Sequence, residues 1–382
     1  MERRIYCDHA ATTPLDGSVF EKMRPYYTEY FGNADSLHSF GRKAQNAVDS
    51  ARDKVAELLN AKPSEIYFTS GGTESDNWAV LGGAYAMKKR GKTHVLLSAI
   101  EHHAVLYAGE KLQKDGFDAE YIPVNAQGRV EISEVVSRIK PTTGFIGVMG
   151  ANNETGAIQP IEEISKIAKE NGALFFTDCV QLAPHKKIDV TALGADLVSI
   201  SAHKFYGPKG CGALYIKKGV AIEKLVAGGE QERGLRGGTV NVPSVVGLAT
   251  AFETCVKERE ETERKLKELR KIFLDGLFKI GGITLNGGLD GETLPSIANV
   301  RIDGVENGAF LYNMDLNGIA VSAGSACASA SLKPSHVLTA MGLTEGEAKS
   351  SIRFSFGKTN TVEEIEYVLK KAKEIIERLR KA

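Results

Sequence analysis

Polar side chains that could do chemistry lie shortly after short apolar runs of this 382-residue chain. Lys204 follows the run LVSI (197–200); its amine could form a Schiff base if it is desolvated, or it could simply reach water. Asp178 follows the run ALFFT (173–177), and Gln181 lies three residues further on. A carboxylate at a strand end can cap a turn, or it can hold a proton on the nitrogen of a heterocycle. Lys204 and Asp178, each considered alone, are compatible with either of their two alternatives.

Three further loops share this position after apolar runs. In TSGGTESDN (69–77), glycines and Thr73 could bind an anion at a helix N-terminus, although an ordinary capped turn has the same composition. In EHH (101–103), paired histidines suggest a metal, but no third ligand lies at suitable spacing, and we favour one histidine as a platform for a cofactor ring. NNETG (152–156) follows FIGVMG (145–150). The five loops together carry far more information than any one of them.

The elements that must position these loops alternate between strand and helix patterns. Amphipathic helical spacing is visible at 43–60 and 161–173. The short apolar runs predict strands at 66–70, 95–100, 145–150, 173–177, 197–200 and 213–216. Apolar strands alternating with helices predict an α/β fold with a mainly parallel sheet covered on both faces. Ligands of such sheets bind beyond the carboxyl ends of the strands, which is where the five loops lie.

The pattern changes near residue 256. A long, charged helix is expected at 257–277, followed by strands at 297–303, 318–321 and 351–356 and a last helix at about 361–380. We therefore predict a large domain (16–256), a smaller α+β C-terminal domain (257–382), and an N-terminal segment (1–15) that packs on the body.

Composition excludes several classes of protein. Lys+Arg and Asp+Glu number 48 each, so the chain lacks the basic excess typical of nucleic-acid binding, and we expect no nucleic-acid partner. The N-terminal segment lacks the apolar region of a secretory signal, and no apolar run approaches the roughly 18 residues of a membrane helix. We therefore expect a cytoplasmic protein without a membrane partner. The five cysteines form no CxxC pair, which predicts free thiols and no metal site.

Eight segments, taken together and in order, resemble the NifS/IscS-type cysteine desulfurases. The resemblance runs essentially end to end. The segments are DHAATTP (8–14), TSGGTESDN (69–77), EHHAV (101–105), NNETG (152–156), DCVQ (178–181), SAHKFYGPKG (201–210), GGEQERGLRGGTVNV (228–242) and SAGSACASAS (322–331).

The resemblance implies a homodimer with the fold type I aminotransferase architecture and a seven-stranded sheet. It also implies dependence on pyridoxal 5′-phosphate (PLP). The implied activity converts L-cysteine to L-alanine and leaves sulfur as a persulfide on an enzyme cysteine. An acceptor protein, such as an iron–sulfur scaffold, would receive that sulfur for cluster assembly or for tRNA or cofactor thiolation.

The same resemblance assigns roles to single residues. Lys204 would form the Schiff base with PLP and move the substrate α-proton, and His102 would stack on the ring and assist proton transfer. Asp178 would pair with the ring nitrogen, and Gln181 with the ring oxygen. Gly72, Thr73, Ser201 and His203 would bind the phosphate, and Thr239 would reach the phosphate in the partner subunit's site. Arg353, with Asn153 nearby, would bind the substrate carboxylate; a surface ion pair is the alternative for this arginine.

Cys327 lies in a run of small residues that predicts a mobile loop, as a thiol that must collect and deliver sulfur would need. The loop has the longer form of the NifS/IscS-like branch. Two segments depart from the family pattern: GNADS (32–36) replaces GNPSS, which leaves any role of Asn33 at the substrate entrance open, and RGGT (236–239) replaces RSGT. Two alternatives remain, a selenocysteine lyase or aminotransferase on the same fold, and a non-catalytic sulfur-relay scaffold.

Overall fold

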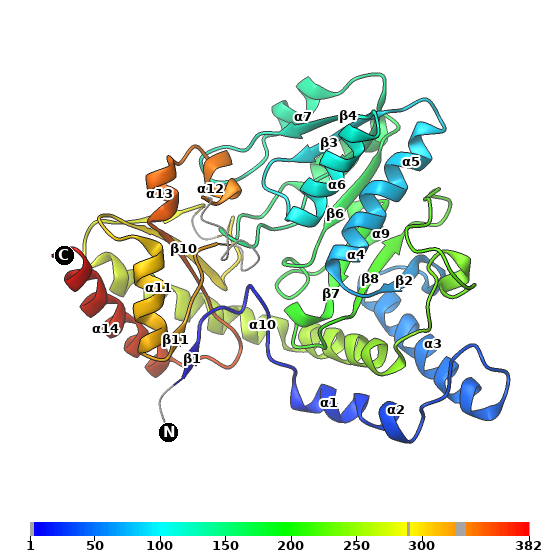
Figure 1. The fold of residues 1–382 in the computed structure, drawn as a ribbon, viewed down its shortest axis with the longest axis horizontal. Helices are drawn as coiled ribbons and strands as arrows, with labels where there is room; N and C mark the ends of the chain where they lie inside the picture. The colour runs from blue at the N-terminus through cyan, green and yellow to red at the C-terminus, as the bar shows by residue number, and fades with distance from the viewer. Residues whose placement is uncertain (1–3, 289–290, 325–333, 382) are drawn as a thin grey trace.

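The computed structural model describes residues 4–288, 291–324 and 334–381, which form a large seven-stranded sheet and a smaller three-stranded sheet (Figure 1). A 37-residue helix, α10 (Val242–Phe278), runs along both. Within the described residues, none of the helices combines the length and apolar character needed to cross a membrane.

The large sheet has the strand order β2-β8-β7-β6-β5-β3-β4 and is mainly parallel, with β8 antiparallel to both of its neighbours. The predicted α/β fold with a seven-stranded, mainly parallel sheet is therefore confirmed. Six strands coincide with the apolar runs of the sequence. The strands are β2 (Ile66–Thr69), β3 (His94–Ser98), β4 (Asp118–Ile122), β5 (Thr143–Gly147), β6 (Leu174–Asp178), β7 (Leu197–Ser201) and β8 (Gly212–Ile216).

The two faces of this sheet bury alternate residues of the same strands. On β3, Val95 and Leu97 pack in one apolar cluster with the π-helical turn (Trp78–Gly82) that continues α4 (Gly72–Asn77), and with α5 (Gly83–Lys88) and α6 (His103–Lys114). Leu96, between them, belongs to the opposite cluster with α3 (Ser39–Leu59), α8 (Ile161–Glu170) and the first part of α10 (Figure 1). Burial on both faces explains why these strands appear as continuous apolar runs.

The helix α10 begins fifteen residues before the charged stretch from which it was predicted. Asn241 caps it by accepting a hydrogen bond from the Ser244 backbone, and Pro243 occupies the first turn, where its missing N–H costs nothing. Residues 242–256 are mostly small or apolar and pack against α3, so they lack the charge pattern of 257–277. The boundary that we predicted at residue 256 thus falls inside a continuous helix, and the division into domains remains a proposal.

The small sheet is antiparallel, with the order β12-β10-β9, and its apolar residues pack against the second half of α10, α11 and α14. The sequence predicted strands that correspond to β10 and β12 but none that corresponds to β9. The elements are β9 (Ile283–Asn286), β10 (Ile297–Ile302), α11 (Asn307–Leu316), β12 (Ser351–Ser355) and α14 (Val362–Leu379). Shorter helices complete the described chain: α1 (Gly17–Met23), α2 (Pro25–Thr28), α7 (Ile132–Arg138), α9 (Val190–Leu193), α12 (His336–Ala340) and α13 (Glu345–Lys349).

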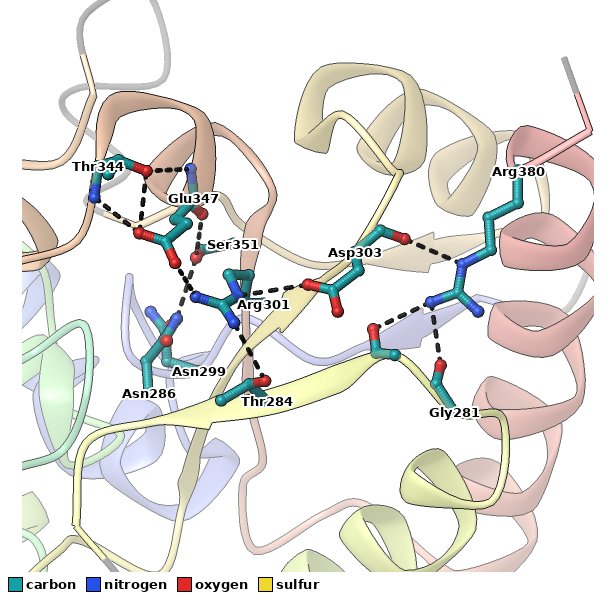
Figure 2. Close-up of polar contacts among 11 residues, drawn as sticks. Gly281, Thr284, Asn286, Asn299, Arg301, Asp303, Thr344, Glu347, Ser351 and Arg380 are labelled. Atoms are coloured by element: carbon teal, nitrogen blue, oxygen red, sulfur yellow. Dashed lines mark hydrogen bonds and ion pairs between the residues drawn. The ribbon is translucent and has the colours of Figure 1, made fainter.

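Polar side chains on the small sheet form a connected network (Figure 2). Arg301 pairs with Glu347 and with Asp303. Asn286 Nδ2 donates to Asn299 Oδ1 (2.8 Å) and to Ser351 Oγ (2.9 Å). The fixed amide of Asn299 then donates to the Glu154 carbonyl (3.1 Å), in the loop that follows β5 of the large sheet. The network therefore holds this loop against the small sheet.

The N-terminal segment also connects the two sheets. Its strand β1 (Ile5–Tyr6) pairs in parallel with β11 (Ile319–Ala320) of the C-terminal region. The segment continues along β12, where the Ser355 N–H donates to the Cys7 carbonyl (2.8 Å), and then reaches the loop after β7, where the Thr13 N–H donates to the His203 carbonyl (2.9 Å).

A buried ion pair fixes the segment 228–242 to the large sheet. Both terminal nitrogens of Arg52, on α3, donate to the two carboxylate oxygens of Glu232 at 2.7 Å. Glu232 also accepts the Phe68 N–H (3.0 Å), and Arg52 donates to the Ile66 carbonyl (2.7 Å). Since both side chains are buried, removing one partner leaves a charge without compensation.

We therefore expect Glu232→Ala to lower the free energy of unfolding by about 3–5 kcal/mol. The matched control is Glu21→Ala, which breaks the exposed 2.9 Å pair with Arg24 and should cost at most about 1 kcal/mol. Urea unfolding followed by circular dichroism measures both. Equal losses for the two variants would contradict a structural role of the buried pair.

Candidate functional site

The predicted site residues meet at one edge of the large sheet. Strands β3, β5, β6 and β7 are parallel, and β2 shares their direction because it is separated from β7 by the antiparallel β8. The loops after these five strands surround a cavity of about 200 Å³. Its lining includes ten of the predicted residues: Gly72, Thr73, His102, Asn153, Asp178, Gln181, Ser201, His203, Lys204 and Arg353.

Lys204 follows β7 on a single turn of 3₁₀ helix and is half-buried. Its Nζ donates to the backbone carbonyls of Ala10 (2.6 Å) and Ala11 (3.0 Å) in the N-terminal segment. These two carbonyls orient the amine at the wall of the cavity. The sequence left two alternatives for Lys204, a desolvated amine and a side chain that reaches water. These contacts favour the amine held by the protein.

Asp178 ends β6, and its carboxylate is buried beside the cavity. Burial raises the pKa of Asp178, while a hydrogen bond from the Val180 N–H (2.8 Å) and the charge of Lys204 oppose that rise. A buried carboxylate of this kind is stabilised by a cationic partner, such as a protonated ring nitrogen. Gln181 is held nearby, since its Nε2 donates to the Ala10 carbonyl (2.8 Å).

His102 caps α6, with its Nδ1 accepting from the Ala104 N–H at 3.2 Å. Burial, together with the charges of Lys204, His103 and His336, lowers the pKa of His102 to about 4. The imidazole is therefore neutral at physiological pH, and a neutral ring can lie against an aromatic heterocycle without a charge penalty.

Across the described residues, no group of three or more His, Cys, Asp or Glu side chains is placed to hold a metal ion.

The loop between β2 and α4 can admit an anion close to the backbone. Gly71 has a φ of 148°, which favours glycine, and a Cβ added to Gly72 would lie 3.1 Å from the Val180 side chain. Thr73 at the start of α4 and Ser201 at the end of β7 contribute hydroxyls to the same cavity. Backbone N–H groups, hydroxyls and His203 form a donor set suited to a phosphate.

Arg353 lies on β12 of the small sheet and is 1% exposed. Its Nη1 donates to the Asn153 carbonyl (2.9 Å), and its Nη2 donates to Asp8 Oδ1 (2.7 Å). Its Nε is buried and has no hydrogen-bond partner among the described residues. Arg353 lines the cavity, and its two contacts use only two of its five N–H donors, so donors remain for a bound carboxylate. The surface ion pair offered as the alternative for Arg353 does not fit, because this side chain is buried.

Five residues of the cavity wall were not singled out from the sequence: Ala10, Ala11, Asp76, Met149 and Val180. Ala10 and Ala11 contribute backbone carbonyls, and no side-chain signal marks such a contact. Asp76, in the TSGGTESDN loop and α4, accepts from Ser199 Oγ (2.6 Å). Burial and the neighbouring carboxylate of Asp178 raise the pKa of Asp76 well above its ordinary value, which favours its neutral form. An aspartate in a short segment rich in polar residues gives no sign that it will be buried.

Two predicted residues remain, Thr239 and Cys327. Thr239 is exposed and does not line the cavity, and its proposed role in the site of a partner subunit stays a prediction. Cys327 lies in the stretch 325–333, outside the described residues.

The two departures from the family pattern also lie away from the cavity lining. Asn33 is exposed, and Asp35 accepts from Gln231 Nε2 at 2.7 Å. Gly237, in RGGT, packs against Gly228: an added Cβ would lie 2.6 Å from the Gly228 Cα. Glycine at position 237 is therefore a packing requirement of this chain.

The residues present fit PLP. Around one cavity they provide a lysine amine, a buried carboxylate that a ring cation would stabilise, a neutral imidazole, and a donor set for a phosphate. A fifth group, the guanidinium of Arg353, suits the carboxylate of an amino acid.

Comparisons with known proteins agree with this geometry. Residues 5–368 match the model of the aminotransferase class-V family. The chain is 47% identical over 382 residues to "cysteine desulfurase IscS" of Clostridium botulinum, covering all of this chain and 96% of that protein. A solved "NifS-like protein" superposes with a TM-score of 0.93 at 39% identity, covering 98% of this chain and all of the other.

A second solved structure, "SspA in complex with cysteine", has a TM-score of 0.83 at 36% identity and covers 94% of this chain and all of that one. The family model matches nearly the whole chain, and the relatives are similar over almost their full length. The chain therefore belongs to the aminotransferase class-V family, among the NifS/IscS-type cysteine desulfurases.

Proposed function

We propose that this protein is a PLP-dependent cysteine desulfurase that converts L-cysteine to L-alanine and carries the sulfur as a persulfide on Cys327. The observation that carries the proposal is the convergence on one cavity of Asp178 from β6, Lys204 from the turn after β7, and Arg353 from β12. Each supplies what an amino-acid substrate and the cofactor require: an amine, a carboxylate and a carboxylate-binding guanidinium.

The cofactor would be held by the five loops. Gly72, Thr73, Ser201 and His203 would bind its phosphate, Asp178 its ring nitrogen and Gln181 its ring oxygen, with His102 against the ring. PLP, when bound, withdraws electrons from the substrate α-carbon and thereby acidifies its C–H bond.

The protein's own groups bind the substrate and move its protons. The Arg353 guanidinium would bind the cysteine carboxylate through N–H donors that Asp8 and Asn153 leave available, fixing the amino acid in one orientation. The Lys204 Nζ, which the Ala10 and Ala11 carbonyls hold at the cavity wall, would take the α-proton and return a proton to carbon. His102, a neutral imidazole whose Nδ1 accepts from the Ala104 N–H, would assist this proton transfer.

The sulfur would leave by nucleophilic attack. The Cys327 thiolate attacks the substrate sulfur, so that an S–S bond forms while the Cβ–S bond breaks and its electron pair stays with carbon. Protonation at carbon then gives alanine, and Cys327 holds the persulfide. The balance is L-cysteine plus enzyme thiol giving L-alanine plus enzyme persulfide.

The remaining cysteines are poorly suited to this role. Burial raises the pKa of Cys7 and Cys211 to about 12 and that of Cys255 to about 11, and it raises the pKa of Cys179 as well. A thiol that stays protonated is a weak nucleophile. This supports Cys327 as the thiol that accepts sulfur.

Assembly and delivery complete the proposal. We propose a cytoplasmic homodimer in which the exposed Thr239 reaches the phosphate in the partner subunit's site. Cys327 would pass its sulfur to an acceptor protein such as an iron–sulfur scaffold. Gel filtration with light scattering tests the dimer, and loading with labelled cysteine followed by capture of labelled proteins tests the acceptor.

The lysine assignment predicts a spectral result. Purified wild type should show the visible absorbance of lysine-bound PLP, and Lys204→Ala should lose this band and cysteine turnover, even if it retains cofactor by other contacts. Lys209→Ala, an exposed lysine of the same segment, is the matched control and should keep both. Full activity of Lys204→Ala would refute the assignment.

The arginine assignment predicts a binding defect. Arg353→Lys should raise the Michaelis constant for cysteine by roughly 10- to 100-fold, because an ammonium cannot reproduce a bidentate contact to a carboxylate. The cofactor spectrum should not change. Arg301→Lys, on β10 of the same sheet and outside the cavity, controls for effects on the sheet. An unchanged Michaelis constant in Arg353→Lys would exclude the role.

The persulfide assignment separates desulfurase activity from other chemistry on this fold. Cys327→Ala should bind PLP and cysteine but release no alanine from cysteine, since no thiol remains to take the sulfur. Cys255→Ala should behave as wild type. Alanine formed per cofactor is the measurement, and mass spectrometry locates the persulfide. Wild-type turnover by Cys327→Ala, or a persulfide on Cys179 or Cys211, would show that the thiol is wrongly assigned.

A further inference from the structure

We propose that Asp8 is the positioning residue of Arg353, setting the orientation in which the guanidinium meets the carboxylate of the substrate. This inference rests on the proposed function, because it concerns the arginine of the same site. Asp8 does not itself line the cavity. Among the predicted site residues, its side chain contacts Arg353.

The contact is a partly buried ion pair between residues 345 positions apart. Arg353 Nη2 donates to Asp8 Oδ1 at 2.7 Å, with the arginine side chain 1% and the aspartate side chain 16% exposed. A guanidinium at this depth is costly without a counter-charge. Asp8 supplies that charge and so allows an arginine to occupy the position.

The contacts of Arg353 leave one part of its fork available. Asp8 takes a hydrogen from Nη2, and the Asn153 carbonyl takes one from Nη1 (2.9 Å). Because acceptors engage both terminal nitrogens, the plane of the guanidinium is fixed. These two contacts use two of the five N–H donors of the guanidinium, and Arg353 lines the cavity. A carboxylate in the cavity can bind donors that remain on the fixed guanidinium with little reorganisation.

Asp8 itself is held in place from both sides. The Ser355 N–H donates to the Cys7 carbonyl (2.8 Å), and the His9 N–H donates to the Ser355 carbonyl (3.2 Å), so the backbone around Asp8 is bonded to the strand that carries Arg353. Two residues on, the Ala10 carbonyl accepts from Lys204. The backbone of Asp8 is therefore fixed relative to β12, so the reach of its short side chain limits where the guanidinium can lie.

Two variants separate positioning from simple charge compensation. Asp8→Ala removes the partner and should raise the Michaelis constant for cysteine about tenfold, with kcat at saturating cysteine nearly unchanged, because binding common to ground and transition state is lost. Asp8→Glu retains the charge and displaces the carboxylate by one methylene, so it should fold as wild type and still raise the Michaelis constant by roughly threefold or more.

The matched control is Asp16→Asn. Asp16 also joins the N-terminal segment to the C-terminal region, through a 2.9 Å pair with Lys358, but it lies outside the cavity around Lys204 and Arg353. Its Michaelis constant should equal that of wild type, and all variants should keep the absorbance of bound cofactor.

A binding measurement makes the test independent of turnover. Isothermal titration of the cofactor-loaded protein with L-alanine should show about tenfold weaker binding for Asp8→Ala. In the Arg353→Ala background, the same Asp8 substitution should cause no further loss, since coupled residues are not additive. Unchanged L-alanine affinity in both Asp8 variants, or losses that add in the double variant, would overturn the proposal. Absence of alanine formation by wild type would instead count against the desulfurase, while the titration still decides the role of Asp8.

Discussion

The direction of one strand decides whether this site can exist. The strand β8 runs opposite to both of its neighbours, and β2, on its far side, therefore points the same way as β7. The loop that contains Gly72 and Thr73 consequently opens at the same edge as the loop that contains Lys204. Were β2 paired antiparallel to β7 directly, the phosphate-binding donors and the lysine would lie at opposite edges of the sheet. The remaining loops follow from the parallel pairing of β3, β5, β6 and β7.

Much of the large sheet could be predicted, because strands buried on both faces appear as apolar runs and the polar residues after them must share an edge. The edge strand β4 (DAEYI) escaped, since its half-exposed positions break that pattern. The start of α10 was not predicted, because its residues pack against α3 and are therefore small or apolar, without the charges that mark the rest of the helix. Asp8 and Ala10 could not be found, because their contacts join distant segments or use the backbone. The resemblance, rather than periodicity, supplied Arg353 and Thr239.

Two buried arginines show how similar environments serve different ends. The terminal nitrogens of Arg52 meet both carboxylate oxygens of Glu232, and a backbone carbonyl adds a further acceptor, so this pair secures the fold. Arg353 has one carboxylate oxygen and one carbonyl as partners and retains an unpaired Nε. Complete pairing makes a structural contact, whereas incomplete pairing beside a cavity leaves a donor for a ligand.

The helix α10 has a mechanical consequence for any motion of the enzyme. At about 1.5 Å per residue, its 37 residues form a rod of roughly 55 Å that packs on the cores of both sheets. Hinge bending between the sheets would require breaking this rod in its middle, where helical hydrogen bonds are continuous. Rocking about the rod axis, or displacement of surface loops, breaks none of them. Substrate entry and product exit should therefore proceed by movements that leave the axis of α10 straight.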